Sequence, residues 1–180
     1  MRPEEYLGLQ WKDIDFERSN VTIQRVVIWR SKLGWYFSEP ETPRSRRSIP
    51  ISESLVRALQ DHKRKQSEER LKVGPKYQNK DLVFATSEGT PLLRRNLVRP
   101  HFKPVLKRAG LPESIRLYDL RHSCATLLLA ENENPKVVSE RLGHTTIRMT
   151  MDVYSHVLPS MQRAASEKLE RMLIQKTGTQ

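Results

Sequence analysis

The apolar residues of this chain change their spacing from a strand pattern to a helix pattern, and that change limits the folds open to it. Three early stretches, residues 21–29, 35–38 and 48–51, are rich in Val, Ile and aromatic side chains, as strands are. Lys32-Leu33-Gly34 supplies a turn after the first stretch, and Pro43-Arg44-Ser45 lies in the connection before the third. We therefore expect a small antiparallel three-stranded sheet.

After residue 51 the apolar spacing favours helices. Ser52 and Asn134 can cap helices at their beginnings, and Gly110 and Gly143 stand where helices end. The expected helices are residues 4–9, 52–70, 94–109, 118–131, 135–142, 146–155 and 160–174. The pattern as a whole predicts an α+β fold that is mainly helical.

The charge of the chain points to an anionic partner. Lys and Arg number 32 against 21 Asp and Glu, a net charge of +11 in 180 residues. A membrane surface is the weaker interpretation, because no apolar run approaches the roughly 20 residues of a spanning helix and no signal peptide is visible. We expect a soluble, cytoplasmic protein that binds nucleic acid.

Metal and disulfide chemistry find little support in the sequence. Asp13 and Asp15 lie between a helix and a strand with no third carboxylate nearby, so a turn is the better interpretation, and no His or Cys spacing is typical of zinc. Cys124 is the only cysteine, which excludes intrachain disulfides. We expect no metal and no cofactor.

Four short motifs carry a resemblance. Residues 118–122 (YDLRH) are followed by residues 142–144 (LGH), and Tyr154 stands ten residues after the histidine of that triplet. Near the beginning, residues 2–15 (RPEEYLGLQWKDID) place an arginine three residues before a glutamate. Together these motifs resemble the two conserved boxes of the tyrosine recombinases, the family of the phage integrases, and the likeness extends over nearly the whole chain.

The resemblance implies a phosphoryl-transfer site. Tyr154 would attack a DNA phosphate and form a 3′-phosphotyrosyl link, while Arg2 and Arg121 would hold the non-bridging oxygens with charged, bidentate hydrogen bonds. His144 would donate to the same phosphate. His122 and Glu5 would support these groups.

Each of these residues also has an ordinary interpretation. A tyrosine near a helix end often packs as an amphipathic side chain, Arg2 would serve as surface charge, and His144 would close a loop. Arg121 has apolar neighbours in sequence and would be costly to bury without an anion, which favours a phosphate, although an internal carboxylate would also suffice.

Two positions depart from the family pattern. Tyr118 stands where the family commonly has histidine. It keeps a hydrogen-bond donor, which suits a supporting role, but tyrosine is a poor proton shuttle near neutral pH, which argues against a general-base role. Glu41 stands where the family usually has the lysine that protonates the leaving oxygen. Lys32 or Arg44 could substitute, and Lys32 is the better donor because the pKa of arginine is too high. We expect slow cleavage with DNA binding retained.

The resemblance also implies how the chain is organised. We expect residues 1–180 to form a catalytic domain that lacks the usual first helix and the N-terminal DNA-clamping domain. Binding to double-stranded DNA would then rest on basic side chains and be sensitive to salt. The candidate DNA-binding residues are Arg44, Arg46, Arg47, Arg94, Arg95 and Arg99. The C-terminal helix, residues 160–175, could dock on a neighbouring subunit of a tetramer on DNA or pack on its own domain.

Three other functions stay open, of which a membrane- or RNA-associated basic protein is the most distant. A type IB topoisomerase would use a similar set of residues to relax DNA. A non-catalytic DNA-binding remnant of an integrase would keep the basic surface, with Glu41 and Tyr118 marking the loss of catalysis.

Overall fold

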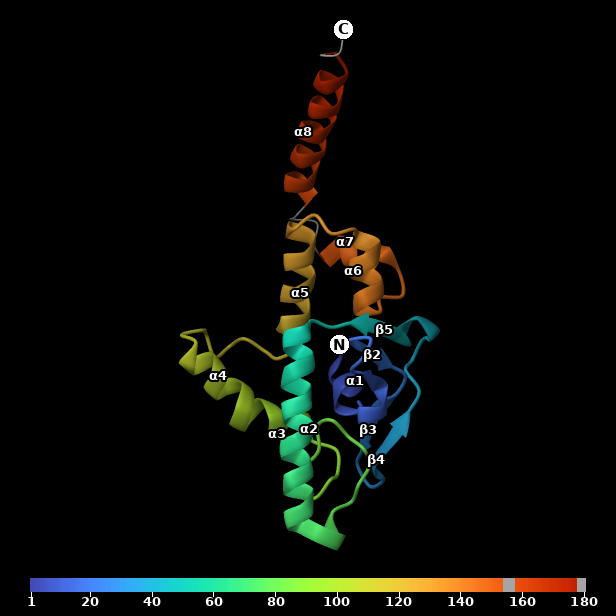
Figure 1. The fold of residues 1–180 in the computed structure, drawn as a ribbon, viewed down its shortest axis with the longest axis vertical. Helices are drawn as coiled ribbons and strands as arrows, with labels where there is room; N and C mark the ends of the chain where they lie inside the picture. Colours follow the sequence, from blue (N-terminus) through green and yellow to red (C-terminus); the bar gives the residue numbers. More distant parts are fainter. Residues whose placement is uncertain (154–157, 178–180) are drawn as a thin grey trace. The chain divides into compact units, whose positions relative to one another are not determined.

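The computed structural model describes residues 1–153 and 158–177, and the chain divides into two compact units, Met1–Arg121 and His122–Gln180. The first unit contains all the strands of the described chain (Figure 1). Its elements are α1 (Pro3–Leu7), β1 (Ile14–Asp15), β2 (Asn20–Ile23), β3 (Val26–Arg30), β4 (Gly34–Ser38), β5 (Arg47–Pro50), α2 (Glu53–Val73), α3 (Arg94–Leu97) and α4 (Lys103–Arg108), with 3-10 turns at Trp11–Asp13, Pro43–Ser45 and Gly74–Lys76. The helices that follow are α5 (Asp119–Ala130), α6 (Pro135–Leu142), α7 (Ile147–Val153) and α8 (Leu158–Thr177). The predicted α+β class with mostly helical content is confirmed.

The strands form two antiparallel sheets. β2 lies between β1 and β5 in a three-stranded sheet, with Val21 opposite both Ile14 and Ile49. β3 and β4 form a separate hairpin in which Trp29 faces Trp35. Lys32 lies in its turn with a left-handed φ of 77°.

The stretch predicted as one strand over residues 21–29 is therefore two strands in two sheets. Asp13 explains the break: its carboxylate accepts a 2.6 Å hydrogen bond from Nε2 of Gln24 and pairs with the guanidinium of Arg25. Asp13 is itself buried, at 4 % exposure. Gln24 and Arg25, the two residues between β2 and β3, thus both direct their side chains to the buried carboxylate of Asp13. The sequence carried a signal of this in Arg25, a charged residue at an inward position of the alternation.

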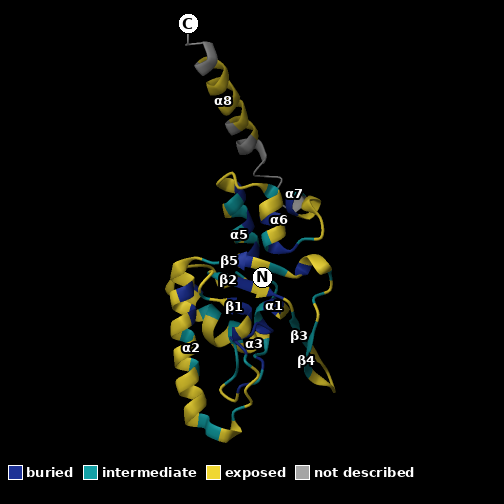
Figure 2. Ribbon diagram, turned by 45° about the vertical axis from the view of Figure 1, so that its right-hand side comes forward, coloured by how far each residue is buried: buried dark blue, intermediate teal, exposed yellow. Residues whose placement is uncertain are grey.

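The core of the first unit joins the three-stranded sheet to α2. Trp11, Ile14, Val21, Leu59 and Val83 form one buried cluster with Leu9. The rest of α2 is exposed along most of its length (Figure 2), because its second half consists mostly of charged and polar residues. Its cap is the predicted one, because Ser52 Oγ accepts a hydrogen bond from the backbone N–H of Leu55.

The helix predicted over residues 94–109 is interrupted by a π-helical turn at Val98–Phe102, between α3 and α4. Pro100 and Pro104 lack the backbone N–H that regular α-helical hydrogen bonds require, which accounts for the irregular turn. Gly110, at a φ of 65°, follows α4 as predicted.

The second unit has its own small core of Ala125, Leu129, Val138 and Leu142. Asn134 caps α6 through its side-chain oxygen, which accepts from the N–H of Lys136. Among the described residues, none of the helices has both the length and the hydrophobicity of a membrane-spanning segment.

Candidate phosphate-binding site

A buried carboxylate organises the candidate site of the first unit. Glu5 lies on α1, and its side chain is 1 % exposed. Its Oε2 accepts a 2.7 Å hydrogen bond from the backbone N–H of Arg2, and its Oε1 lies 3.2 Å from Nη1 of the same arginine. α1 comes close enough to β3 for this geometry because Gly8 has no side chain: a Cβ there would lie 2.8 Å from the backbone nitrogen of Val27.

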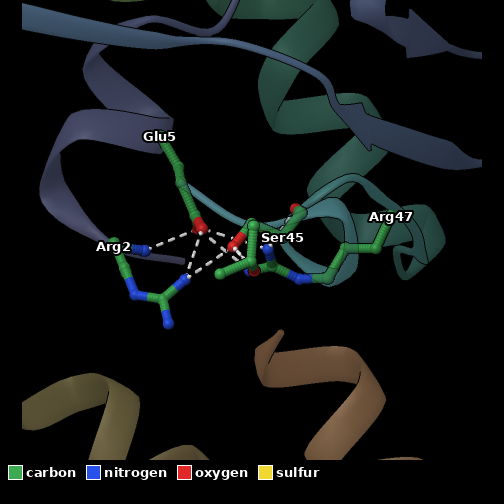
Figure 3. Close-up of polar contacts among 5 residues, drawn as sticks. Arg2, Glu5, Ser45 and Arg47 are labelled. Atoms are coloured by element: carbon green, nitrogen blue, oxygen red, sulfur yellow. Dashed lines mark hydrogen bonds and ion pairs between the residues drawn. The ribbon is translucent and has the colours of Figure 1, made fainter. Parts of the chain in front are cut away.

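Arg47 at the beginning of β5 holds the same carboxylate from a second side (Figure 3). Its Nη1 and Nη2 donate to the two oxygens of Glu5 over 3.0 and 2.9 Å, a bidentate pair. Burial by itself would raise the pKa of Glu5. The hydrogen bonds and charge of Arg47, with the backbone N–H of Arg2, outweigh burial and lower that pKa below its ordinary value.

Arg47 is one of the candidate DNA-binding residues, and the structure shows that its side chain is only 7 % exposed and is engaged with Glu5. Arg47 therefore holds the carboxylate of Glu5, which in turn binds Arg2. The partner lies 42 positions earlier in the chain, so no local pattern could reveal the pair.

Arg121, at the beginning of α5, is buried as well, at 6 % exposure, and it feels the charges of Arg2, Glu5 and Arg47; we call these four residues the arginine cluster. Burial, and then the nearby charge of Arg2, lower its pKa from the ordinary value. Arg47 acts in the same direction, whereas Tyr118 and Glu5 raise it. Three cations thus act on one another around a single carboxylate. Arginine stays protonated even so, and the surplus of positive charge makes this cluster suited to an anion.

Ser45 also belongs to this cluster, although no sequence pattern singles it out. It is 3 % exposed, and its Oγ lies 3.3 Å from Nη1 of Arg2 and 2.9 Å from Oγ1 of Thr42. Its carbonyl oxygen accepts a 2.8 Å hydrogen bond from Nη1 of Arg47. One small residue therefore contacts both arginines that hold Glu5, and it ties them to the loop that contains Glu41.

His144 lies in the second unit, directly after Gly143, which ends α6 with a left-handed φ of 68°. The backbone N–H of His144 donates to the carbonyl of Ser139 over 3.0 Å, which fixes the loop. Its Nδ1 lies 2.8 Å from Oγ1 of Thr150 on α7. Tyr154, the predicted nucleophile, lies outside the described residues.

The other predicted residues occupy varied positions. Tyr118 and His122 are half-buried near the beginning of α5, and Lys32 and Glu41 are exposed. The remaining predicted DNA-binding residues, Arg44, Arg46, Arg94, Arg95 and Arg99, are all exposed. Arg46 pairs with Glu39.

The described residues contain no group of three or more His, Cys, Asp or Glu side chains that could hold a metal ion.

Comparison with known sequences decides the family. Residues 1–161 match the model of the phage integrase family. The chain belongs to this family. Among curated phage integrase relatives, a tyrosine recombinase XerC-like protein of Caldanaerobacter subterraneus subsp. tengcongensis is 36% identical over 97% of this chain and 47% of its own length. The ICEBs1 integrase of Bacillus subtilis is 31% identical over 96% of this chain and 46% of its own.

Solved structures of phage integrase relatives agree with this fold. A Tn1549 transposon integrase in complex with transposon right end DNA superposes with a TM-score of 0.77 at 25% identity, covering 94% of this chain and 55% of that one. The XerH recombinase bound to its difH substrate gives a TM-score of 0.63 at 25% identity, over 92% of this chain and 41% of that one. The chain spans about half the length of the curated relatives it matches.

Proposed function

We propose that this chain is the catalytic part of a site-specific recombinase that cuts and rejoins DNA through a covalent bond between Tyr154 and a 3′ phosphate. The observation that carries the proposal is the arginine cluster: Arg2 and Arg121 lie with Arg47 around one buried carboxylate, which leaves positive charge over for a phosphate. Membership of the phage integrase family supports the assignment of the nucleophile.

In the proposed reaction, the phenolic oxygen of Tyr154 attacks the phosphorus and passes its proton to solvent, and the bond from phosphorus to the 5′ oxygen breaks. Arg2 and Arg121 hold the non-bridging oxygens while charge builds up on them. Glu5 and Arg47 hold Arg2 in place. The 5′ hydroxyl of another strand then reverses the step, so the energy of the phosphodiester is kept and no nucleotide cofactor takes part.

The leaving 5′ oxygen needs a proton, and this chain is unusual at that point. Glu41 is exposed on the loop that follows β4, at the position where the family usually has lysine. A carboxylate there repels the phosphate and does not supply a proton at neutral pH. Lys32, exposed in the turn between β3 and β4, is the substitute we favour on chemical grounds. Cleavage is accordingly slow.

The proposed substrate is double-stranded DNA. The Tn1549 integrase and XerH structures contain DNA, and five exposed arginines of this chain offer phosphate contacts. Self-association on DNA is the second part of the proposal, with α8 docking on a neighbouring subunit. It is supported by the large apolar side chains exposed on α8, Leu169, Met172, Leu173 and Ile174.

The test is a covalent adduct on a denaturing gel. Nicked duplexes carrying candidate recombination sites trap the phosphotyrosyl link, because the short released strand diffuses away. We expect an adduct with the wild-type chain and with Tyr77→Phe, a control tyrosine that contacts Arg70, and none with Tyr154→Phe. Salt-sensitive binding without any adduct would instead identify a DNA-binding remnant, the function that Glu41 favours.

A further inference from the structure

Thr150 is a fully buried hydroxyl residue in contact with the candidate histidine. It lies on α7 and is 0 % exposed. Within the described part of the chain, its Oγ1 makes one hydrogen bond, the 2.8 Å contact with Nδ1 of His144. The loop between the two residues is short, and the backbone bond from His144 to Ser139 holds its beginning.

The direction of this hydrogen bond decides where the imidazole carries its proton. A threonine hydroxyl has one hydrogen to donate, and a neutral imidazole has a hydrogen on only one of its nitrogens. If Nδ1–H donated to Thr150, the buried hydroxyl hydrogen would need another acceptor. Since Oγ1 has its one described hydrogen bond with Nδ1, donation from Thr150 to Nδ1 satisfies both groups. This arrangement is favoured by roughly tenfold or more over the one that leaves a buried donor unmet.

We propose that Thr150 is a positioning residue that fixes His144 in the neutral tautomer with its hydrogen on Nε2. The ring then presents an N–H donor on the side away from α7, and it does so without needing a positive charge. Donation from this N–H to a non-bridging phosphate oxygen rests on the function proposed above. The tautomer itself does not rest on it.

Nitrogen-15 NMR of the full chain, labelled at histidine, tests the tautomer directly. The spectrum is recorded at about pH 8, above the ordinary histidine pKa, and His144→Gln identifies the signals of His144. We expect a protonated Nε2 and an unprotonated Nδ1 in the wild-type chain and in Thr150→Ser, which keeps the hydroxyl. Thr150→Val, which keeps the shape, should give a mixture of tautomers.

The control is Thr146→Val, at an exposed residue just before α7, which should leave the spectrum unchanged. A hydrogen on Nδ1 in the wild-type chain would overturn the proposal, as would an unaltered tautomer in a folded Thr150→Val. If that variant does not fold, the wild-type and Thr150→Ser spectra still decide.

A second readout addresses the role in catalysis. Thr150→Val should slow adduct formation about tenfold with unchanged DNA affinity, because it removes the hydrogen bond that sets the tautomer of His144. Thr150→Ser keeps the hydroxyl donor and should react at the wild-type rate. Equal rates in folded Thr150→Val and wild-type chains would remove Thr150 from the reaction. Absence of any adduct in the wild-type chain would count against the proposed function alone, since the NMR result stands apart from it.

Discussion

Replacing Glu5 with Gln tests how the arginine cluster is held. The variant keeps the size of the side chain and removes the one negative charge that Arg2 and Arg47 share. Arg47 and Arg121, at 7 % and 6 % exposure, are then left buried among like charges. Breaking a buried ion pair from one side costs about 3–5 kcal/mol, and the retained amide oxygen favours the lower end, about 3 kcal/mol.

The assay is thermal unfolding followed by circular dichroism. For a chain of this length about 3 kcal/mol corresponds to a fall in Tm of roughly 6–12 °C. Glu4→Gln is the matched control, because Glu4 is the exposed neighbour on the same helix and should change Tm by little. Sulfate should raise the Tm of Glu5→Gln more than that of the control, since an anion can replace the lost charge.

The pH dependence follows from the lowered pKa of Glu5. A carboxyl group whose pKa is lower in the folded chain adds stability above its unfolded value, near 4.5, and this contribution is lost as pH falls through the folded value. The difference in Tm between wild type and Glu5→Gln should therefore be constant above about pH 5 and shrink at lower pH. A Glu5→Gln chain as stable as Glu4→Gln at neutral pH would refute the reasoning.

Four further results are expected. Ser45→Ala removes an acceptor from Nη1 of Arg2 and should slow adduct formation roughly two- to tenfold, with DNA affinity nearly unchanged by a binding assay. Glu41→Lys should speed adduct formation; an unchanged rate would place residue 41 away from the phosphate. Asp13→Asn should lower the free energy of unfolding in urea by about 3 kcal/mol, because it leaves the mostly buried Arg25 without its anion. The logarithm of DNA affinity should fall with the logarithm of salt concentration at a slope of about −4.5, from the five exposed arginines, and a flat response would contradict phosphate binding.

Local signals were sufficient to predict most of the helices. Ser52, Asn134, Gly110 and Gly143 act within one turn of a helix end, and each lies where the sequence indicated. The strands were harder, because the division at Gln24 and Arg25 depends on a carboxylate that lies eleven and twelve positions earlier. The spacing of apolar residues continues from β2 into β3 without a break, so it does not reveal where one strand ends and the next begins.

The site shows the same division between local and distant information. The family motifs indicated Arg2, Arg121 and His144 because each stands within a short, ordered pattern. Ser45 and Thr150 have no such pattern, and their importance comes from burial and from contacts made after folding. In sequence Arg47 resembles the other candidate DNA-binding arginines, and only its distant partner Glu5 distinguishes it.

The most direct test of the proposed chemistry is to locate the covalent bond. The adduct formed on nicked DNA would be digested with nuclease and protease, and the modified peptide would be sequenced by mass spectrometry. We expect a nucleotide remnant on Tyr154 in the wild-type chain. The Arg121→Gln variant should form no such adduct, because it lacks the guanidinium that binds the phosphate oxygens. A remnant on any other residue, or no adduct under conditions where the chain binds DNA, would contradict the proposal.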